Sequence, residues 1–168
     1  MVTTVPSQIP TLTEALSKAL ITHRLSMVTA ESCTGGLIAA SCTDLSGSSA
    51  WFERGFVTYS NAAKTDMLGV PAELIDRYGA VSEPVARAMA LGALKHSLAD
   101  CSVAVTGVAG PTGGSIEKPV GTVWLAWALR QSPHCESVVH VLTGDRQAVR
   151  YATTALALSR LTALILKS

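Results

Sequence analysis

The sequence has few charged residues, and its positive and negative charges nearly balance. Lys and Arg total 13 and Asp and Glu total 12 in 168 residues, which gives a formal net charge of +1 at pH 7. A protein that binds nucleic acid usually shows a basic excess or a basic face. The composition therefore disfavours nucleic acid as a partner.

Long apolar runs are missing as well, although 48% of the residues are hydrophobic. A membrane-spanning helix needs about 20 mainly apolar residues. The longest apolar stretches, residues 120–129 and 151–166, are too short or are interrupted by Arg160. Residues 1–10 show no basic region followed by an apolar block, so they do not resemble a signal peptide. We therefore predict a cytoplasmic protein that does not associate with a membrane.

The spacing of cysteine and histidine gives no sign of a metal site. Cys33, Cys42, Cys101 and Cys135 form no C-x-x-C pair, and the four histidines are scattered. Metal sites usually show closely spaced ligands, and a disulfide framework is not expected without an export signal. We predict no metal, no other cofactor and buried thiols, with Cys33 alone kept as a functional candidate because it lies in a Gly-containing loop.

Apolar periodicity predicts an α/β protein with about five strands and five helices in mostly β-α order. The pattern favours a three-layer α/β/α sandwich with a mixed, mainly parallel sheet. Two strands expected at 120–129 and 136–142 have no helix between them, so that part of the sheet should be antiparallel. The Ala- and Gly-rich helix expected at 82–98 should pack closely on the sheet.

The first ten residues contain two threonines and two prolines and are predicted to form a flexible tail. Residues 11–168 contain no internal repeat and no linker, so we predict a single domain there.

Three loops combine hydroxyl groups with glycines where predicted strands end: residues 31–36, 47–49 and 106–114. Ligands of such sheets lie at the carboxyl ends of strands. Thr34, Gly35 and Gly36, at the start of a predicted helix, would suit an oxyanion or a phosphate. Gly-rich turns often serve only to reverse the chain, so a purely structural role stays open.

No histidine lies near these loops in sequence, so a serine nucleophile would need another base. A desolvated lysine can act as one when its pKa falls toward neutrality. Ser48, Ser49, Lys64 and Lys118 are available. Spacing alone does not join Ser49 to Lys64, and a lysine on a short helix is more often solvated.

Five motifs, in order, resemble the CinA C-terminal domain family over roughly residues 12–164. They are TAESCTGG at 29–36, GSSAWF at 47–52, YSN at 59–61 with Lys64, GAVSE at 79–83, and TGVAGP at 106–111 with KPVGTV at 118–123. Many family members carry this domain behind a molybdopterin-binding-like domain. This chain resembles the stand-alone, nicotinamide-nucleotide amidohydrolase type.

The resemblance implies a three-layer α/β/α domain and a small-molecule pyridine nucleotide as substrate. The implied reaction hydrolyses nicotinamide mononucleotide to nicotinate mononucleotide and ammonia, a step in pyridine-nucleotide recycling. It also implies a catalytic serine–lysine pair at Ser49 and Lys64. Tyr59, Thr106 and Arg146 match further positions regarded as functionally important in the family.

We therefore expect Ser49 to attack the carboxamide carbon while neutral Lys64 takes its proton, with backbone N–H groups around Ser48 holding the oxyanion. Ser32 is the rival nucleophile, because it lies on a strand-to-helix turn. Cys33 is a third candidate without an adjacent base.

Tyr59 would lower the pKa of Lys64, relay a proton or stack on the pyridine ring, and Arg146 would bind the 5′-phosphate. Thr106 and the loop after it would position the ribose or phosphate. The predicted substrate-binding residues are Ser32, Thr34, Gly35, Gly36, Ser48, Thr106, Gly107, Gly110 and Arg146.

Two other functions stay open. One is a non-catalytic nucleotide-binding or interaction module linked to competence or DNA damage, and the other is an amidase for a different substrate. The apolar composition of so small a domain also leads us to expect a homodimer.

Overall fold

In the part of the chain that the structure describes, the strands form one sheet in the order β2-β1-β3-β4-β5. The strands are β1 (Met27–Glu31), β2 (Phe52–Val57), β3 (Cys101–Gly107), β4 (Thr122–Leu129) and β5 (Cys135–Val141). β1 pairs in parallel with both β2 and β3, whereas β4 pairs antiparallel with β3 and β5. β4 thus runs against the other strands, which confirms the prediction of a mixed, mainly parallel sheet.

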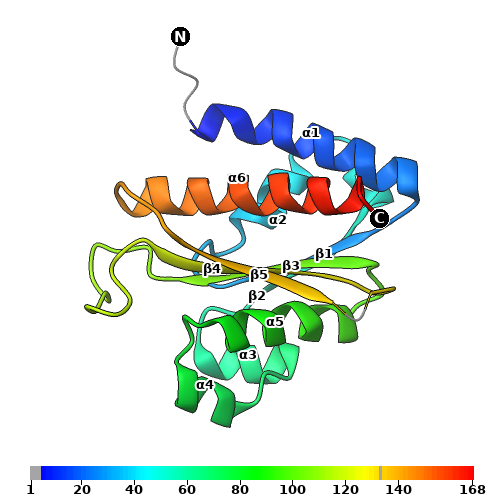
Figure 1. The fold of residues 1–168 in the computed structure, drawn as a ribbon. Coiled ribbons are helices and arrows are strands. Elements are labelled where there is room, and N and C mark those ends of the chain that lie inside the picture. Colours follow the sequence, from blue (N-terminus) through cyan, green and yellow to red (C-terminus); the bar gives the residue numbers. More distant parts are fainter. Residues whose placement is uncertain (1–4, 133) are drawn as a thin grey trace.

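Helices cover both faces of this sheet in the computed structural model, which describes residues 5–132 and 134–168 (Figure 1). One layer holds α1 (Val5–His23), α2 (Leu37–Thr43) and α6 (Arg146–Ile165). The opposite layer holds α3 (Asn61–Leu68), α4 (Ala72–Tyr78) and α5 (Glu83–Lys95). The three-layer α/β/α prediction is confirmed.

Side chains alternate between the two faces of the sheet along each strand, so a separate hydrophobic core forms on each face. On β1, Met27 packs into the core under α1 and α6, whereas Val28 packs into the core under α5. The same alternation on β4 sends Trp127 to the first core and Trp124 to the second. The central strands β1 and β3 are therefore buried on both faces of the sheet, as is usual for parallel strands.

The N-terminal segment differs from the prediction of a tail over residues 1–10. Helix α1 begins at Val5, so the described part of that segment is helical, and residues 1–4 lie outside the described residues. Pro10 lacks an N–H and costs the helix one hydrogen bond. Ile9, which is 6% exposed, packs into the core, and Thr13 donates to the Ile9 carbonyl at 2.9 Å. Burial at Ile9 thus offsets the proline that suggested a tail.

Gly92 determines how closely α5 approaches the C-terminal end of α3. A Cβ atom at this position would lie 2.1 Å from the Leu68 carbonyl oxygen. This close approach matters to the site described below, because α3 also carries Lys64.

We predict that Gly92→Ala lowers the free energy of unfolding by about 1–3 kcal/mol, because the added methyl group pushes α5 away from α3. Helix propensity alone predicts the opposite sign, a gain of about 1 kcal/mol. Urea denaturation measures the difference, with Leu91→Ala on the exposed side of the same helix as the control. A stabilised Gly92→Ala protein would contradict the close packing of these helices.

Candidate functional site

Lys64 is a charged residue type in a buried position, with 1% of its surface exposed. Helix α3 begins after Ser60, whose side chain accepts a hydrogen bond from the Ala63 N–H, and Lys64 lies one turn further on. From there its side chain reaches the point where β1 and β2 end. A buried lysine of this kind needs polar partners.

Three oxygen atoms surround the Lys64 Nζ. It lies 2.9 Å from the Thr58 carbonyl oxygen, 3.2 Å from the Tyr59 carbonyl oxygen and 3.0 Å from Ser32 Oγ. Burial lowers the pKa of Lys64 from its ordinary value near 10.5. A protonated amine donates to all three oxygens, Ser32 Oγ included, whereas a neutral amine keeps two N–H groups for the two carbonyls and turns its lone pair toward the Ser32 hydroxyl. The contacts therefore suit Lys64 as a base toward Ser32.

The parallel pairing of β1 with its neighbours places Ser32 beside Lys64. Ser32 follows the last residue of β1, and its N–H donates to the Val105 carbonyl on β3 at 3.1 Å. On the other side, the Thr58 N–H donates to the Glu31 carbonyl at 2.8 Å. The end of β1 is thus fixed to both adjacent strands, and the Ser32 hydroxyl points to the lysine that follows β2.

A cavity of about 220 Å³ opens in front of this pair. Residues that line it come from the ends of β1 and β3 and from the start of α6. The start of α6 is at the left of Figure 1. The cavity's lining residues are Ser32, Cys33, Tyr59, Asn61, Lys64, Ala80, Val81, Thr106, Gly107, Ala109 and Arg146. We call this space the Ser32–Lys64 cavity.

Arg146 closes one side of the Ser32–Lys64 cavity by joining two loops. Its guanidinium donates to the Gly110 carbonyl at 2.8 Å and to the Tyr59 hydroxyl at 3.1 Å. The Tyr59 hydroxyl therefore contacts arginine, and it is the Tyr59 backbone carbonyl that contacts Lys64. This arrangement gives the Tyr59 side chain a place at the mouth of the cavity.

Thr106 and Gly107, the last two residues of β3, also line the Ser32–Lys64 cavity. Thr106 donates its hydroxyl proton to the Ala80 carbonyl at 2.9 Å, which ties the loop at 79–83 to β3. Gly110 is buried and contributes its carbonyl to Arg146.

Cys33 lines the cavity but has the wrong ionisation for a nucleophile. Burial raises the pKa of the Cys33 thiol to about 11, so the thiol keeps its proton near neutrality. All four cysteines are buried and unpaired, which confirms the prediction for the thiols.

The predicted pair of Ser49 and Lys64 is not assembled. Ser49 lies in a short 3₁₀ helix, Ser48–Ala50, just before β2, and the Trp51 carbonyl accepts the N–H of Met27 at the start of β1. Ser32 follows the other end of β1, about 17 Å from Met27 at roughly 3.3 Å per residue. Ser48 and Ser49 therefore lie at the opposite end of the strands from Lys64, and the structure does not bring the predicted pair together.

The predicted anion site at Thr34 is also corrected, because a carboxylate already occupies the start of α2. Glu31, which is fully buried, accepts the Thr34 hydroxyl at 2.7 Å and the N–H groups of Ile38 and Ala39 at 2.9 Å each. A second anion would be repelled there. Gly35 and Gly36 complete this turn with positive φ angles and do not line the Ser32–Lys64 cavity.

Sequence reasoning gave no role to Asn61, Ala80 and Val81, which also line the cavity. The motifs YSN and GAVSE contained them, but nothing in the spacing placed the second motif beside Lys64. Only the packing of the segment before α5 against β3 brings it there.

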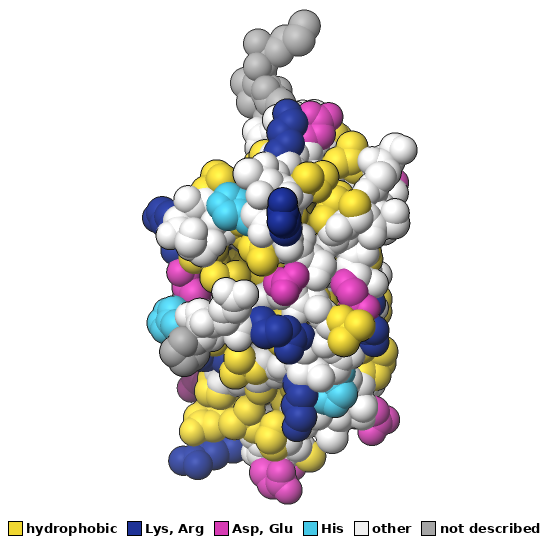
Figure 2. Space-filling view, turned by 90° about the vertical axis from the view of Figure 1, so that its right-hand side faces the viewer, with side chains coloured by type: hydrophobic (Ala, Val, Ile, Leu, Met, Phe, Trp, Pro, Cys, Tyr) yellow, Lys and Arg dark blue, Asp and Glu magenta, His cyan; other side chains and the backbone are white. Residues whose placement is uncertain are grey.

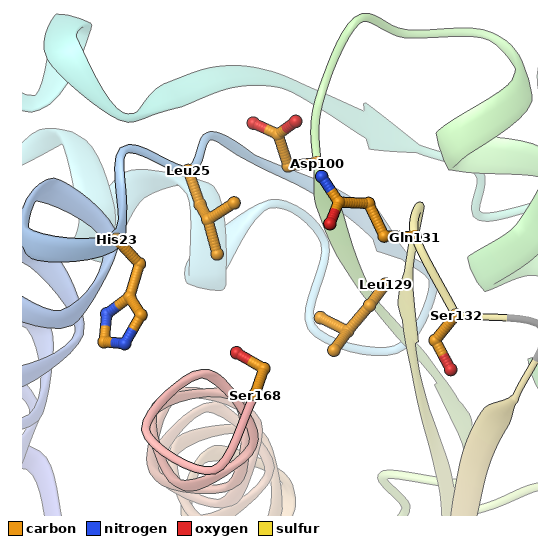
Figure 3. A pocket seen from close by; sticks show the side chains of 7 residues that line it. All are labelled: His23, Leu25, Asp100, Leu129, Gln131, Ser132 and Ser168. Carbon is orange, nitrogen blue, oxygen red and sulfur yellow. The ribbon is translucent and has the colours of Figure 1, made fainter.

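A different cavity, of about 440 Å³, lies at the opposite end of the strands, and His23 and Asp100 are among the residues that line it (Figure 3). The two side chains point in different directions, and each already has a partner. Asp100 accepts from Ser26 N–H at 2.8 Å, and a His23 ring nitrogen lies 2.9 Å from the Ala19 carbonyl oxygen. Figure 2 shows this end of the molecule, where acidic and basic side chains are interspersed with apolar ones. This cavity therefore offers no paired nucleophile and base.

Within residues 5–132 and 134–168, no group of three or more His, Cys, Asp or Glu residues is placed to hold a metal ion. None of the described helices combines the length and the apolar character that crossing a bilayer demands.

Comparison with known sequences agrees with the resemblance in the motifs. The family model described as CinA C-terminal domain matches residues 9–165. The nicotinamide-nucleotide amidohydrolase PncC of Escherichia coli is 52% identical over 157 residues, which are 92% of this chain and 93% of that protein. A CinA-like protein of Akkermansia muciniphila is 62% identical over 69% of this chain, which corresponds to 29% of that longer protein.

Solved structures show the same fold. The competence/damage inducible protein CihA from Agrobacterium tumefaciens matches with a TM-score of 0.90 and 47% identity, over 94% of this chain and 95% of that one. A CinA superfamily protein from Klebsiella pneumoniae matches with a TM-score of 0.91 and 36% identity, over 95% and 99% of the two chains.

The lowered pKa of Lys64 predicts a specific dependence of stability on pH. Because the folded protein holds this proton less tightly than the unfolded chain, the lysine's contribution to stability rises with pH between its folded pKa and about 10.5. Urea denaturation of wild type and Lys64→Met across this range isolates that contribution, since other titrating groups cancel in the difference. Wild type should gain relative to the variant as pH rises. A difference that is flat or falls with pH would contradict the burial of Lys64.

Proposed function

The chain belongs to the CinA C-terminal domain family, and we propose that it hydrolyses the carboxamide of nicotinamide mononucleotide to nicotinate mononucleotide and ammonia. The substrate is suggested by the relatives named nicotinamide-nucleotide amidohydrolase. The observation that supports the chemistry is the 3.0 Å contact between Ser32 Oγ and Lys64 Nζ inside a cavity.

Ser32 is the nucleophile in this proposal. Neutral Lys64 accepts the Ser32 hydroxyl proton while Oγ bonds to the carboxamide carbon, which forms a tetrahedral intermediate. The carbon–nitrogen bond then breaks, and Lys64 gives its proton to the departing nitrogen, so that ammonia leaves and Ser32 carries the acyl group.

Water completes the reaction. A water molecule attacks the ester carbon, Lys64 takes a proton from it, and the proton returns to Ser32 Oγ as the acid is released. One amide and one water are consumed, and one carboxylic acid and one ammonia are formed. The backbone N–H of Cys33, the residue after the nucleophile, is our candidate donor to the oxyanion.

Two neighbours support the geometry. Tyr59 contributes a carbonyl that holds Lys64 and a ring at the mouth of the cavity, and Arg146 fixes that ring. In this proposal both residues position the substrate and the base, and neither one transfers a proton.

The predicted cytoplasmic location and homodimer remain proposals. An apolar surface that a second subunit could cover lies on the edge strand β5, where Val139 and Val141 are 43% and 61% exposed.

We predict that Ser32→Ala lowers the rate of ammonia release from nicotinamide mononucleotide by roughly 100- to 10,000-fold, because the nucleophile and the proton acceptor act as a pair. Ser49→Ala is the matched control, because Ser49 is exposed at the opposite end of the strands. Its rate of ammonia release should stay within about 2-fold of the wild-type rate.

The opposite ranking of the two serine variants would show that the nucleophile is misassigned. A folded wild-type protein that releases no ammonia from this substrate would refute the proposed activity. A binding module or an amidase for another substrate would then remain.

A further inference from the structure

A second hollow adjoins the Ser32–Lys64 cavity and has no role in the reaction steps above. Its volume is about 630 Å³, and it lies between the loop that follows β3 and the first turns of α6. Pro111 and Val120 line it from the loop region, and Gln147 and Arg150 line it from α6. Because Ala109 and Arg146 line both spaces, the two hollows are neighbours. We call the second space the α6 hollow.

The Ser32–Lys64 cavity is too small for a whole nucleotide. Small-molecule sites usually span about 300–1,000 Å³, and the cavity around the pair has about 220 Å³. With the carboxamide placed at Ser32, the pyridine ring takes up part of this cavity, so the ribose and its phosphate need space outside. The α6 hollow is the adjoining space of sufficient size.

Arg146 already has a structural task. Its guanidinium uses one N–H on the Gly110 carbonyl and one on the Tyr59 hydroxyl, and these two bonds hold it between two loops. Moving Arg146 to a phosphate would release Tyr59 from the mouth of the cavity. If Arg146 bound the phosphate in this way, as the sequence suggested, the hydrogen bond that holds the Tyr59 ring would be lost.

Arg150 lies one helical turn further along α6 and lines the α6 hollow. It is half-buried, and one terminal nitrogen donates to the Thr34 carbonyl at 2.8 Å. Among the described residues, the rest of its guanidinium has no hydrogen-bond partner. That contact with Thr34 restrains the side chain, and the remaining N–H groups are free to pair with an anion in the hollow.

The one acidic side chain among the residues that line the hollow already accepts a hydrogen bond. Asp145 lines the α6 hollow, and its carboxylate accepts the Ala148 N–H at 2.8 Å as the N-cap of α6. Two arginines against one capped carboxylate leave the hollow positive, which favours a dianionic monophosphate ester.

We infer that the α6 hollow binds the 5′-phosphate of the substrate and that Arg150 determines the preference for a phosphorylated substrate. This inference rests on the proposed function, and it adds the part of the chain that distinguishes a nucleotide from a nucleoside. Nicotinamide riboside, which lacks only the phosphate, would leave the charge of Arg150 unpaired.

The test compares kcat/KM for nicotinamide mononucleotide with kcat/KM for nicotinamide riboside in each variant. Loss of a charge-assisted hydrogen bond predicts that Arg150→Gln lowers the ratio by about 10- to 100-fold, mainly through KM for the nucleotide. Arg160→Gln is the matched control. Arg160 lies on the same helix but pairs with Glu136 and lines neither hollow, so the ratio should stay unchanged.

Charge substitutions at Gln147 test the same inference in a way that does not depend on whether Arg150→Gln folds correctly. Gln147 is exposed at the first turn of α6 and lines the same hollow. Gln147→Glu adds a negative charge beside the phosphate and should lower the ratio, whereas Gln147→Lys should raise it. An acidic residue at a helix start is favourable, so the first of these variants should fold.

The outcomes separate this inference from the proposed function. Equal losses on both substrates in Arg150→Gln would show that Arg150 acts only through Thr34, and unchanged ratios across both series would likewise overturn the phosphate site. In either case, wild-type ammonia release from the nucleotide leaves the proposed function standing. If the wild type hydrolyses neither compound, the function fails, and calorimetric binding of both compounds to the same variants tests the hollow on its own.

Discussion

A lysine amine held in a dry position by three oxygen atoms is the constraint on which the site depends. Lys64 comes from α3, its carbonyl partners come from the end of β2, and Ser32 comes from the end of β1. These groups meet only if β1 and β2 pair in parallel and end side by side. The fold therefore serves the chemistry by bringing two strand ends and one helix to a common point, and burial at that point lowers the pKa of the lysine.

The buried carboxylate of Glu31 performs the complementary task on the other side of Ser32. By accepting two N–H groups at the start of α2 and the Thr34 hydroxyl, it fixes the turn that carries the nucleophile. The same contacts remove the start of α2 from the anion-binding surface. The anionic part of a substrate must then lie elsewhere, and the positive region beside the start of α6 adjoins the Ser32–Lys64 cavity.

The sequence contained enough information for the layers of the fold. Alternation along β1 and β4 and helical spacing in α5 and α6 depend on local periodicity, and the structure has the predicted three layers. The motif at 59–64 also singled out Tyr59 and Lys64, which the structure places together in the lining of the Ser32–Lys64 cavity. The beginning of α1 was missed because Pro6 and Pro10 suggest a tail, whereas the burial of Ile9 depends on a helix, α6, that lies more than a hundred residues away.

The choice between Ser32 and Ser49 could not be made from local patterns. Both serines lie in loops with glycine, and the decision depends on which end of β1 each loop occupies. That requires the parallel register of Met27 with Phe52, a relation between distant segments. The same limit applies to Arg150, which no motif marks and which gains meaning only from the hollow that α6 forms with the loop after β3.

The most direct test of the central claim is to identify the residue that carries the acyl group during turnover. Wild-type protein is mixed with nicotinamide mononucleotide, quenched in acid within the first turnover, and mapped by peptide mass spectrometry. Our account predicts that the acyl adduct forms on Ser32 and is absent in Lys64→Met, where the serine lacks its base. An adduct on Ser49 or Cys33, or an adduct on Ser32 that forms at the wild-type rate without Lys64, would contradict it.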